Sequence, residues 1–313
     1  MIYILIFMQD RISTMTPKLP LVSIITPSFN KGPYIEETIM SIRNQTYQNI
    51  EHIVFDGAST DETISILKKY NKNLKWISEP DKGQSDAINK GWRIAKGDII
   101  AYLNADDTYL TDAVESAVAF FEKNPDVYML YGDGVITDEY GKNPRVIQSG
   151  TVSLKNLVFC QNTIFQPSVF LRREVFTIVG DVDVDLHLAM DFDYWLRIAL
   201  VYKTGYLQKP LSVAKIYPDA KSSALMFRYV KECEYILDKL FATLGIPWEI
   251  LQYKKDAYTY IFTKGGLDYL HAKMLKDGMS YLWKAFRMNP VACIKYTGAL
   301  FARYAQKTKD PIF

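Results

Sequence analysis

The sequence is poor in the residues from which disulfides and soft-metal sites are built. Its 313 residues include three cysteines and three histidines. Cys160, Cys233 and Cys293 are far apart and odd in number, so no disulfide framework or zinc-ligand spacing follows, and a reducing compartment fits best. We expect all three to be core residues. The scarcity of histidine argues in the same way against a His-rich metal site.

Long apolar runs are also missing. The N-terminus, MIYILIFMQDR, holds an apolar run of eight residues, too short to span a bilayer, and no basic segment precedes it as in a signal peptide. No other window reaches the roughly 18 consecutive apolar residues of a spanning helix. We therefore predict a protein that does not cross a membrane. Residues 1–19 are expected to be a disordered extension, with residues 1–14 alternatively arising from a start codon upstream of Met15.

Neither sign of charge is in large excess. The formal net charge is +2, which is too small to argue for nucleic acid as a partner. The distribution is uneven, however. Residues 1–213 hold 21 Lys and Arg against 26 Asp and Glu, and residues 214–313 hold 16 against 9. An acidic body with a basic tail predicts different partners for the two parts. Ordinary solvated helix faces explain the tail equally well.

What the sequence does contain is a regular alternation of strand-like and helix-like runs. The expected strands are 21–26, 50–56, 74–79 and 98–104, and the expected helices between them are 33–45, opened by Pro33, 59–70, capped by Ser59 or Thr60, and 83–97. Such repetition predicts βαβ units and a mainly parallel sheet. Further on we expect a strand and hairpin over 127–142, a strand over 162–176, a helix from Asp191, and helices over 222–244, 248–274, 276–288 and 291–307.

Polar residues follow each of the first four strands, and open α/β sheets bind ligands beyond the carboxyl ends of their strands. These residues are Ser28 and Asn30, Asp56, Glu79 and Asp81, and Asp106 and Asp107. Each alone is an ordinary turn residue, but four sets at one sheet edge predict a site. Glycine-rich phosphate loops are absent: there is no G-x-x-x-x-G-K-[ST], and no G-x-G-x-x-G after the first strand.

The adjacent carboxylates of Asp106 and Asp107 would repel each other in a cleft without a cation. Mg²⁺ and Mn²⁺ prefer oxygen ligands and are commonly held by one or two carboxylates together with substrate phosphates. The pair therefore predicts a divalent metal at this edge of the sheet.

Three segments together resemble a family 2 glycosyltransferase over roughly residues 20–215. They are PLVSIITPSFNKGPYIEETIMSIRNQTYQNIEHIVFDGASTDET, SEPDKGQSDAINKGWRIAKGDIIAYLNADD and DLHLAMDFDYWLRIA. The resemblance implies an inverting enzyme that uses nucleotide-sugar donors. It also implies the GT-A fold, a Rossmann-like mixed, mainly parallel sheet flanked by helices. The expected domains are a catalytic domain over 20–217 and a helical C-terminal region over 218–313.

The same resemblance implies a donor site at the strand ends. Thr26, Pro27 and Phe29 match the pocket for the donor's base, and Asp56 matches an acid that contacts the base. The family commonly has two acids there, whereas Gly57 follows here. A turn or cap role for Asp56 is the alternative.

Further donor contacts implied by the resemblance lie in EPDKGQSDAINKG, where Asp81 and Asp86 match ribose or base contacts. Lys82 of this segment lies near the phosphates or is simply solvated. NADD takes the place of the family's D-x-D element, with Asn104 toward the ribose. Asp106 would coordinate the metal on the diphosphate. Asp107 would assist either as a further ligand or by contacting the ligands without touching the metal.

The acceptor side is implied by the third segment. Asp191 matches the family's general base, although Met190 stands where many members have Glu. A helix N-cap is the alternative reading of Asp191, and Asp193 is expected to point elsewhere. Gln166 is an acceptor-binding candidate. The predicted mechanism is a single displacement, in which the metal stabilises the departing nucleoside diphosphate and Asp191 takes the acceptor's proton.

Partners and location follow from the resemblance and the tail. A UDP-sugar is the most frequent donor, and the acceptor is expected to be a glycan or a lipid-linked glycan in bacterial surface polysaccharide biosynthesis. VACIKYTGALFARYAQK combines apolar residues with Lys295, Arg303 and Lys307, which suits a membrane-surface helix. The protein is therefore expected to be cytoplasmic, with possible peripheral membrane contact.

Two other functions remain open on the sequence. A nucleotidyltransferase would need a Gly/Arg/Lys-rich phosphate loop after the first strand, where TPSFNKGPY offers Lys31 alone. A non-catalytic binding or scaffold protein would use the helical tail as its working surface, but would have no physical reason to keep Asp106, Asp107 and Asp191.

Overall fold

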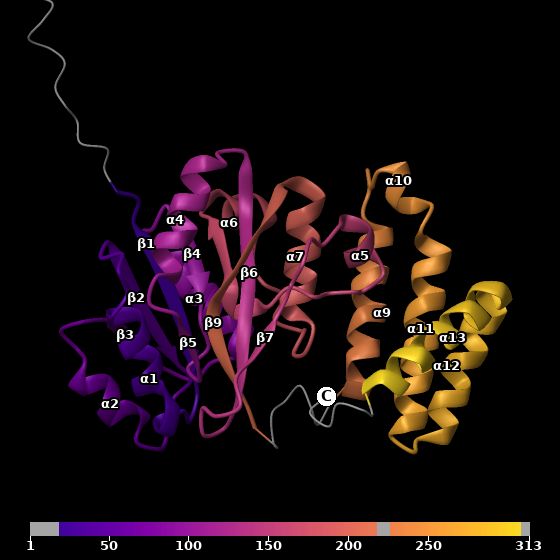
Figure 1. The fold of residues 1–313 in the computed structure, drawn as a ribbon, viewed down its shortest axis with the longest axis horizontal. Coiled ribbons are helices and arrows are strands. Elements are labelled where there is room, and N and C mark those ends of the chain that lie inside the picture. Colours follow the sequence, from indigo (N-terminus) through magenta and orange to yellow (C-terminus); the bar gives the residue numbers. More distant parts are fainter. Residues whose placement is uncertain (1–18, 218–225, 308–313) are drawn as a thin grey trace, which may run out of the picture.

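The computed structural model describes residues 19–217 and 226–307, so the expectations for residues 1–18 lie outside the described residues. A nine-stranded sheet runs through the first part of the chain, in the order β3-β2-β1-β4-β8-β6-β9-β5, with β7 paired to β6 (Figure 1). The strands are β1 (Val22–Ser28), β2 (Ile50–Asp56), β3 (Lys75–Ser78), β4 (Ile99–Tyr102), β5 (Asp107–Tyr109), β6 (Val127–Asp138), β7 (Arg145–Ile147), β8 (Val169–Arg172) and β9 (Lys203–Ile216).

The sheet is mixed and mainly parallel, as expected. β1 to β4 form a parallel half, in which β1 lies between β2 and β4. β8 joins this half antiparallel to β4 and also pairs antiparallel to β6. β9 runs parallel to β6 over most of its length, and β5 pairs antiparallel to β9 at the far end of the sheet.

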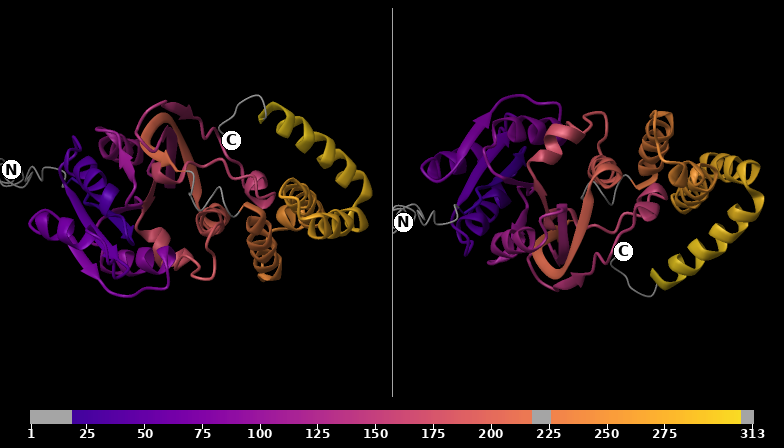
Figure 2. Two further views of the ribbon diagram at one scale, coloured as in Figure 1. Left: turned by 90° about the horizontal axis from the view of Figure 1, so that it is seen from below. Right: turned by 90° about the horizontal axis from the view of Figure 1, so that it is seen from above.

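Helices flank the sheet, and a helical region follows it. The flanking helices are α1 (Gly32–Arg43), α2 (Thr63–Lys69), α3 (Gln84–Ile94), α4 (Ala113–Lys123), α5 (Leu154–Val158), η1 (Gln166–Ser168), α6 (Glu174–Val179) and α7 (Met190–Val201). The C-terminal helices are α9 (Met226–Ala242), α10 (Trp248–Leu251), α11 (Lys254–His271), α12 (Leu275–Met288) and α13 (Pro290–Lys307). Figure 2 shows these C-terminal helices gathered at the end of the molecule opposite β3.

One hydrophobic cluster joins the two parts. It extends from Ile25 and Tyr102 of the sheet, through Trp195 of α7, to Cys233 of α9 and Ile261 of α11. α9 stands between α7 and the remaining C-terminal helices (Figure 1). All three cysteines are free and buried, as expected for core residues. Burial of this shared apolar surface is the main force holding the helical region against the sheet.

Several boundaries differ from the sequence-based expectations. α2 starts at Thr63 with Glu62 as N-cap, so the expected cap at Ser59 or Thr60 is wrong. The Ser59 hydroxyl donates to Asp56 instead, and the Thr60 N–H donates to the side chain of Asn30. These bonds hold the segment in a loop before the helix begins.

The expected single strand over 162–176 is also wrong, because this segment divides into η1, β8 and the start of α6. Arg172 is the last residue of β8. Its guanidinium donates to the carbonyl oxygens of Val127 and Phe121 and lies 4.9 Å from the centre of the Phe121 ring. This arginine therefore ties β8 to the end of α4.

In the helical region, the expected helix 248–274 is two helices, α10 and α11, with a break at Gln252–Tyr253. Gly278 lies inside α12. The turn before α12 contains Lys273 in a left-handed conformation, φ 61°. A Cβ on Gly278 would lie 3.0 Å from the carbonyl oxygen of Gly266, so this glycine permits close packing of α12 on α11.

Candidate active site

The acids of NADD lie where the chain leaves β4 and enters β5. The carboxylate of Asp106 is 20% exposed, and its Oδ2 lies 2.5 Å from the Nζ of Lys31, which stands in the loop between β1 and α1. The same ammonium lies 5.7 Å and 6.0 Å from the ring centres of Tyr34 and Tyr217. Buried near Asp106, the hydroxyl of Tyr217 has no hydrogen-bond partner among the described residues. A positive charge therefore already lies against Asp106.

Asp107 is buried behind Asp106. Burial, and then the charge of Asp106, raises the pKa of the Asp107 carboxyl to about 8. The side-chain amide of Asn104 donates to Asp107 at 2.9 Å and to the Gln166 side chain at 3.1 Å, and the Gln84 amide donates to Asn104 at 2.6 Å. Asn104 therefore links α3, β5 and η1, and its side-chain oxygen keeps one lone pair that can accept a further hydrogen bond.

The strand ends on the donor side carry residues that are largely engaged within the protein. Thr26 is buried and shares a 2.9 Å hydrogen bond with His52 of β2, and Pro27 is also buried. Phe29, by contrast, is 59% exposed. Asp56 is 1% exposed and accepts hydrogen bonds from the Ser59 N–H at 2.9 Å and the Ser78 hydroxyl at 2.6 Å. These contacts match the turn role that the sequence left open for Asp56.

The other two donor candidates lie between β3 and the first turn of α3. Asp81 accepts a hydrogen bond from the Gly83 N–H at 2.8 Å. Asp86 accepts from the Lys82 N–H at 3.1 Å and lies 3.3 Å from the Nζ of Lys90. The lysine contact and these hydrogen bonds outweigh desolvation and lower the pKa of the Asp86 carboxyl. Both acids therefore stabilise this loop in the structure.

Asp191 lies in the first turn of α7, near Tyr102. The charges of Asp191 and Asp107 both act to raise the pKa of the buried Tyr102 hydroxyl, after desolvation, which raises it most. Burial raises the pKa of the Asp191 carboxyl to about 6, against the 2.7 Å hydrogen bond that it accepts from the Phe192 N–H. The N-cap of α7 is Ala189, so the alternative reading of Asp191 as N-cap is wrong.

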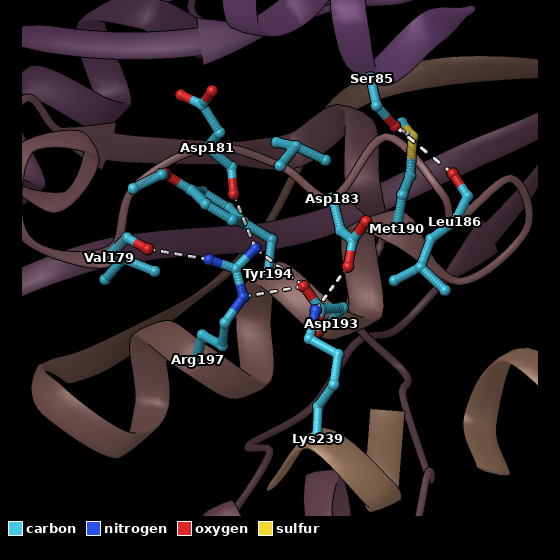
Figure 3. Close-up of polar contacts among 12 residues, drawn as sticks. Ser85, Val179, Asp181, Asp183, Leu186, Met190, Asp193, Tyr194, Arg197 and Lys239 are labelled. Atoms are coloured by element: carbon cyan, nitrogen blue, oxygen red, sulfur yellow. Dashed lines mark hydrogen bonds and ion pairs between the residues drawn. The ribbon is translucent and has the colours of Figure 1, made fainter. Parts of the chain in front are cut away.

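Asp193 lies two residues after Asp191 in α7, about 200° further around the helix, so it points elsewhere, as expected. Its carboxylate accepts from the Arg197 guanidinium at 2.8 Å and lies 3.6 Å from the Nζ of Lys239 in α9 (Figure 3). Arg197 also donates to the carbonyl oxygens of Val179 and Asp181, at 2.9 Å each. Asp193 is thus the centre of a structural ion-pair network on the face of α7 opposite to Asp191.

A cavity of about 380 Å³ opens beside Met190, the residue before Asp191. Its walls are the loop Lys82–Ser85, the loop from Val184 to Met190, and Arg228 and Glu232 of α9. Met190 is held in the wall by the Ser85 hydroxyl, whose oxygen lies 2.9 Å from its sulfur (Figure 3). The cavity therefore reaches the residue next to Asp191 from the side of the helical region.

The structure brings Asn104, Asp106, Asp107, Gln166 and Asp191 into one region around Tyr102. It leaves Thr26, Asp56, Asp81 and Asp86 in local contacts at neighbouring strand ends. Sequence reasoning gave no site role to Tyr217 or Glu232, and it weighed Lys31 only as a phosphate-loop residue. The one feature of the sequence that pointed to Lys31 was its position directly after the first strand.

A divalent cation fits the residues present at the end of β4. The described part of the chain holds no cluster of three or more His, Cys, Asp or Glu side chains that could form an all-protein metal site. Mg²⁺ and Mn²⁺ are, however, often held by one or two carboxylates plus substrate phosphates. The buried Tyr217 hydroxyl, which has no hydrogen-bond partner among the described residues, provides a further oxygen near these carboxylates.

A mixed α/β sheet with paired carboxylates beyond a central strand defines the class of GT-A enzymes. The chain matches the model of "Glycosyl transferase family 2" over residues 23–177. It is 34% identical over 185 residues to an uncharacterized glycosyltransferase of Mycobacterium tuberculosis, covering 58% of this chain and 70% of the relative. The chain therefore belongs to glycosyltransferase family 2 and carries a glycosyltransferase domain, not that of a nucleotidyltransferase or a scaffold.

Other relatives extend the comparison. A PGL/p-HBAD biosynthesis glycosyltransferase of Mycobacterium bovis is 30% identical, covering 57% of this chain and 69% of the relative. An uncharacterized glycosyltransferase of Rickettsia bellii is 27% identical over 82% of this chain, yet the chain spans only 38% of its length.

Solved structures show the same fold. S. aureus TarS 1–349 in complex with UDP-GlcNAc has a TM-score of 0.57 at 17% identity, covering 83% of this chain and 90% of that one. The mannosyltransferase PcManGT from Pyrobaculum calidifontis, in complex with GDP-Man and Mn²⁺, has a TM-score of 0.60 at 21% identity, covering 91% and 81%.

Proposed function

We propose that the chain transfers a sugar, with inversion, from a nucleotide-sugar donor to a hydroxyl group of a glycan or lipid-linked acceptor in bacterial surface polysaccharide biosynthesis. The observation that carries the proposal is that acids from two separate elements lie near Tyr102: Asp107, next to Asp106 at the end of β4, and Asp191 in the first turn of α7. One position suits the charge of a diphosphate complex, and the other suits proton removal.

The donor is proposed to be a UDP-sugar, in line with the UDP-GlcNAc complex of TarS, and the GDP-Man complex of PcManGT provides the alternative. The exposed ring of Phe29 suits stacking on a base. The buried Thr26 and Pro27 would shape the pocket through the backbone. Further proposed donor contacts are Asp56, Asp81, Asp86, Asn104 and Asp106.

Asp106, with Asp107 beside it, is proposed to hold Mn²⁺ or Mg²⁺. Such a cation, when bound, stabilises negative charge on the departing nucleoside diphosphate as a Lewis acid. Lys31 would then release Asp106 and donate to a phosphate oxygen, which lies within the reach of its flexible side chain. Asn104, fixed by Gln84 and Gln166, orients Asp107 and so keeps the two carboxylates apart.

Asp191 is proposed as the general base. A carboxyl group with a pKa of about 6 is mostly ionised at neutral pH, yet is a better proton acceptor than an ordinary aspartate. It would take the proton of the acceptor hydroxyl as that oxygen attacks the anomeric carbon. The displacement is a single step, so no covalent sugar–enzyme intermediate forms. The cavity beside Met190 is the proposed path of the acceptor, with Gln166 as a weaker acceptor contact.

A membrane surface is the proposed location of the acceptor. Among the described residues, no helix has the length and apolarity to cross a bilayer. Leu275, Met279 and Trp283 repeat every four residues on α12 and are 61–67% exposed, so they form one apolar stripe. The exposed Lys276 and Arg287 flank it. An apolar stripe beside cationic side chains suits an anionic lipid surface.

Vesicle sedimentation tests this location. Trp283→Glu should lose binding to phosphatidylglycerol vesicles, while Trp248→Glu, which alters an exposed tryptophan of α10, should keep it. Equal binding by both variants, or equal binding to neutral phosphatidylcholine vesicles, would contradict the lipid contact.

Calorimetric binding of UDP, GDP, dTDP and CDP, with and without Mn²⁺, tests the donor site. We expect one nucleotide to bind in a metal-dependent way to wild type and to Asp112→Ala, and to bind at least about 100-fold more weakly to Asp106→Ala. Asp112 is the matched control, because it also lies 2.5 Å from a lysine, Lys209, away from the sheet edge. Binding of none of the four to the folded protein would reject the donor site.

A further inference from the structure

The segment that leads into α7 is held by a side chain from the C-terminal helical region. The carboxylate of Glu232, in α9, accepts hydrogen bonds from the N–H groups of Leu188 and Ala189 at 2.8 Å and of His187 at 3.2 Å. These residues directly precede the first turn that carries Asp191. Ala189 is the N-cap residue of α7 and has no polar side chain, and the other two residues lie in the loop before it. Glu232 therefore fixes the end of this loop and the N-cap of α7 from outside the segment.

The carboxylate of Glu232 also lies at the positive end of the α7 dipole. The N-terminus of a helix carries a partial positive charge, so an anion bonded there is stabilised and in turn holds the helix end in place. Three hydrogen bonds to consecutive N–H groups fix both the position and the direction of the segment.

A second contact from α9 anchors the same segment further along. Lys239 lies 2.5 Å from Asp183, in the loop before α7, and 3.6 Å from Asp193 inside α7 (Figure 3). Glu232 and Lys239 thus bind the segment 183–193 at two points. Because α9 is packed into the shared core through Cys233, Ile236 and Leu237, both contacts come from a rigid support.

We infer that Glu232 is a positioning residue, which makes α9 part of the catalytic machinery by fixing the first turn of α7 and with it the carboxylate of Asp191. The inference rests on the proposed role of Asp191 as general base. It assigns to the helical region a function in the transfer step itself, besides any contact with membrane or acceptor.

Glu232 also acts on Asp191 through its charge. The titratable groups that face Asp191 are Glu232 and Tyr229 of α9 and Tyr102 of β4. The negative charge of Glu232 adds to burial in raising the pKa of Asp191. Neutralising Glu232 would therefore lower this pKa, so that the base stays ionised at lower pH.

The test compares Glu232→Gln and Glu232→Ala with Glu234→Gln, a matched control on the same helix. Glu234 faces α12, where it contacts Tyr281 and Lys284 at 3.3 and 3.4 Å. The assay is release of nucleoside diphosphate from UDP-GlcNAc or GDP-mannose, with water as acceptor. We expect kcat to fall about 10- to 100-fold in Glu232→Ala, as a misplaced base would produce, with the donor KM within about twofold of wild type.

The pH profile separates positioning from stability. The acid limb of kcat/KM should move to lower pH in Glu232→Gln and stay in place in Glu234→Gln. Hydrogen exchange gives a reading that needs no activity: the amides of residues 187–189 should exchange faster in Glu232→Ala than in Glu234→Gln. Unchanged exchange, or unchanged kcat and acid limb in folded Glu232 variants, would overturn the inference. Full activity of Asp191→Asn would instead reject the proposed base.

Discussion

The acids at the end of β4 and the acids in the first turn of α7 have different surroundings and different partners. Asp106 and Asp107 are adjacent and share one environment, in which Lys31 contacts the first and burial raises the pKa of the second to about 8. Asp191 and Asp193 lie on opposite faces of one helix, and the basic partners, Arg197 and Lys239, contact Asp193. The two acids at the end of β4 thus share one environment, whereas α7 holds its two acids in separate ones, with the ion pairs on the side of Asp193.

Asp191→Asn should have the largest effect, because the amide cannot accept the acceptor's proton. We expect kcat to fall by about 10²- to 10⁴-fold, the usual contribution of a general base, while nucleotide affinity is retained. Initial rates of nucleoside diphosphate release and calorimetric binding measure the two quantities. A loss of nucleotide affinity equal to the loss of rate would mean that Asp191 belongs to the donor site.

Asp193→Asn should show the opposite pattern, with stability rather than rate affected. Removing the carboxylate leaves Arg197 and Lys239 without their shared acid, at an expected cost of about 1–3 kcal/mol in the free energy of unfolding. The value is below that of a fully buried pair because both basic side chains reach solvent. Urea unfolding measures it. Asp126→Asn, which breaks an exposed pair with Lys203, is the control and should unfold like wild type.

The same urea unfolding measurements distinguish the role of Asp191 from that of Asp193. The folded-state pKa of Asp191, about 6, lies above its ordinary value, so ionisation opposes folding and its stability cost grows as pH rises from about 4 to 6. Asp191→Asn should therefore be at least as stable as wild type at pH 8. A marked loss of stability there would show that Asp191, like Asp193, is a structural acid.

The pH dependence of transfer should report Asp191. With a pKa of about 6, the base is increasingly protonated below that pH, so kcat/KM should fall about tenfold per pH unit there and level off above it. Rates between pH 4.5 and 8.5 test this expectation, with unfolding monitored in parallel. An acid limb near pH 4 would indicate a base in an ordinary aqueous environment.

Lys31→Met should produce the smallest change, at the sheet edge. Losing the ammonium frees Asp106 for a cation, so the affinity for Mn²⁺ without nucleotide should rise by up to about fivefold, the strength of a partly exposed ion pair. Titration of Mn²⁺ followed by electron paramagnetic resonance measures this. Lys209→Met, which frees Asp112, should leave Mn²⁺ binding as in wild type, and weaker binding by Lys31→Met would mean that the lysine supports the metal site.

Local patterns in the sequence were sufficient for much of the fold. The strand over residues 50–56 is predicted residue for residue, because a run of β-branched and aromatic residues bounded by turn formers has few other solutions. The start of α2 was missed because the Ser59 hydroxyl has an equally short-range alternative, the Asp56 carboxylate. A serine hydroxyl can either cap a helix or form a hydrogen bond within a turn, and the sequence alone does not decide between the two.

The site was predictable where its residues lie next to each other and hidden where they do not. The carboxylates of Asp106 and Asp107 are evident from NADD and its place after a strand. The contacts of Lys31 with Asp106, and of Glu232 with the start of α7, join elements far apart in the sequence. No local pattern encodes such pairs, because they exist only once the sheet and α9 are packed together.

The order of the strands has a consequence for how the site forms. β5 follows β4 after four residues, yet it pairs with β9, whose residues Ser212–Ala214 are made about a hundred residues later. Closing such long loops is slow, because the chain entropy is lost before the contact is made. A chain that has folded only its parallel half therefore contains Asp107 but lacks the pairing with Ala214 of β9 that fixes its backbone. The end of β4 acquires its final geometry only when the last strand of the sheet is in place.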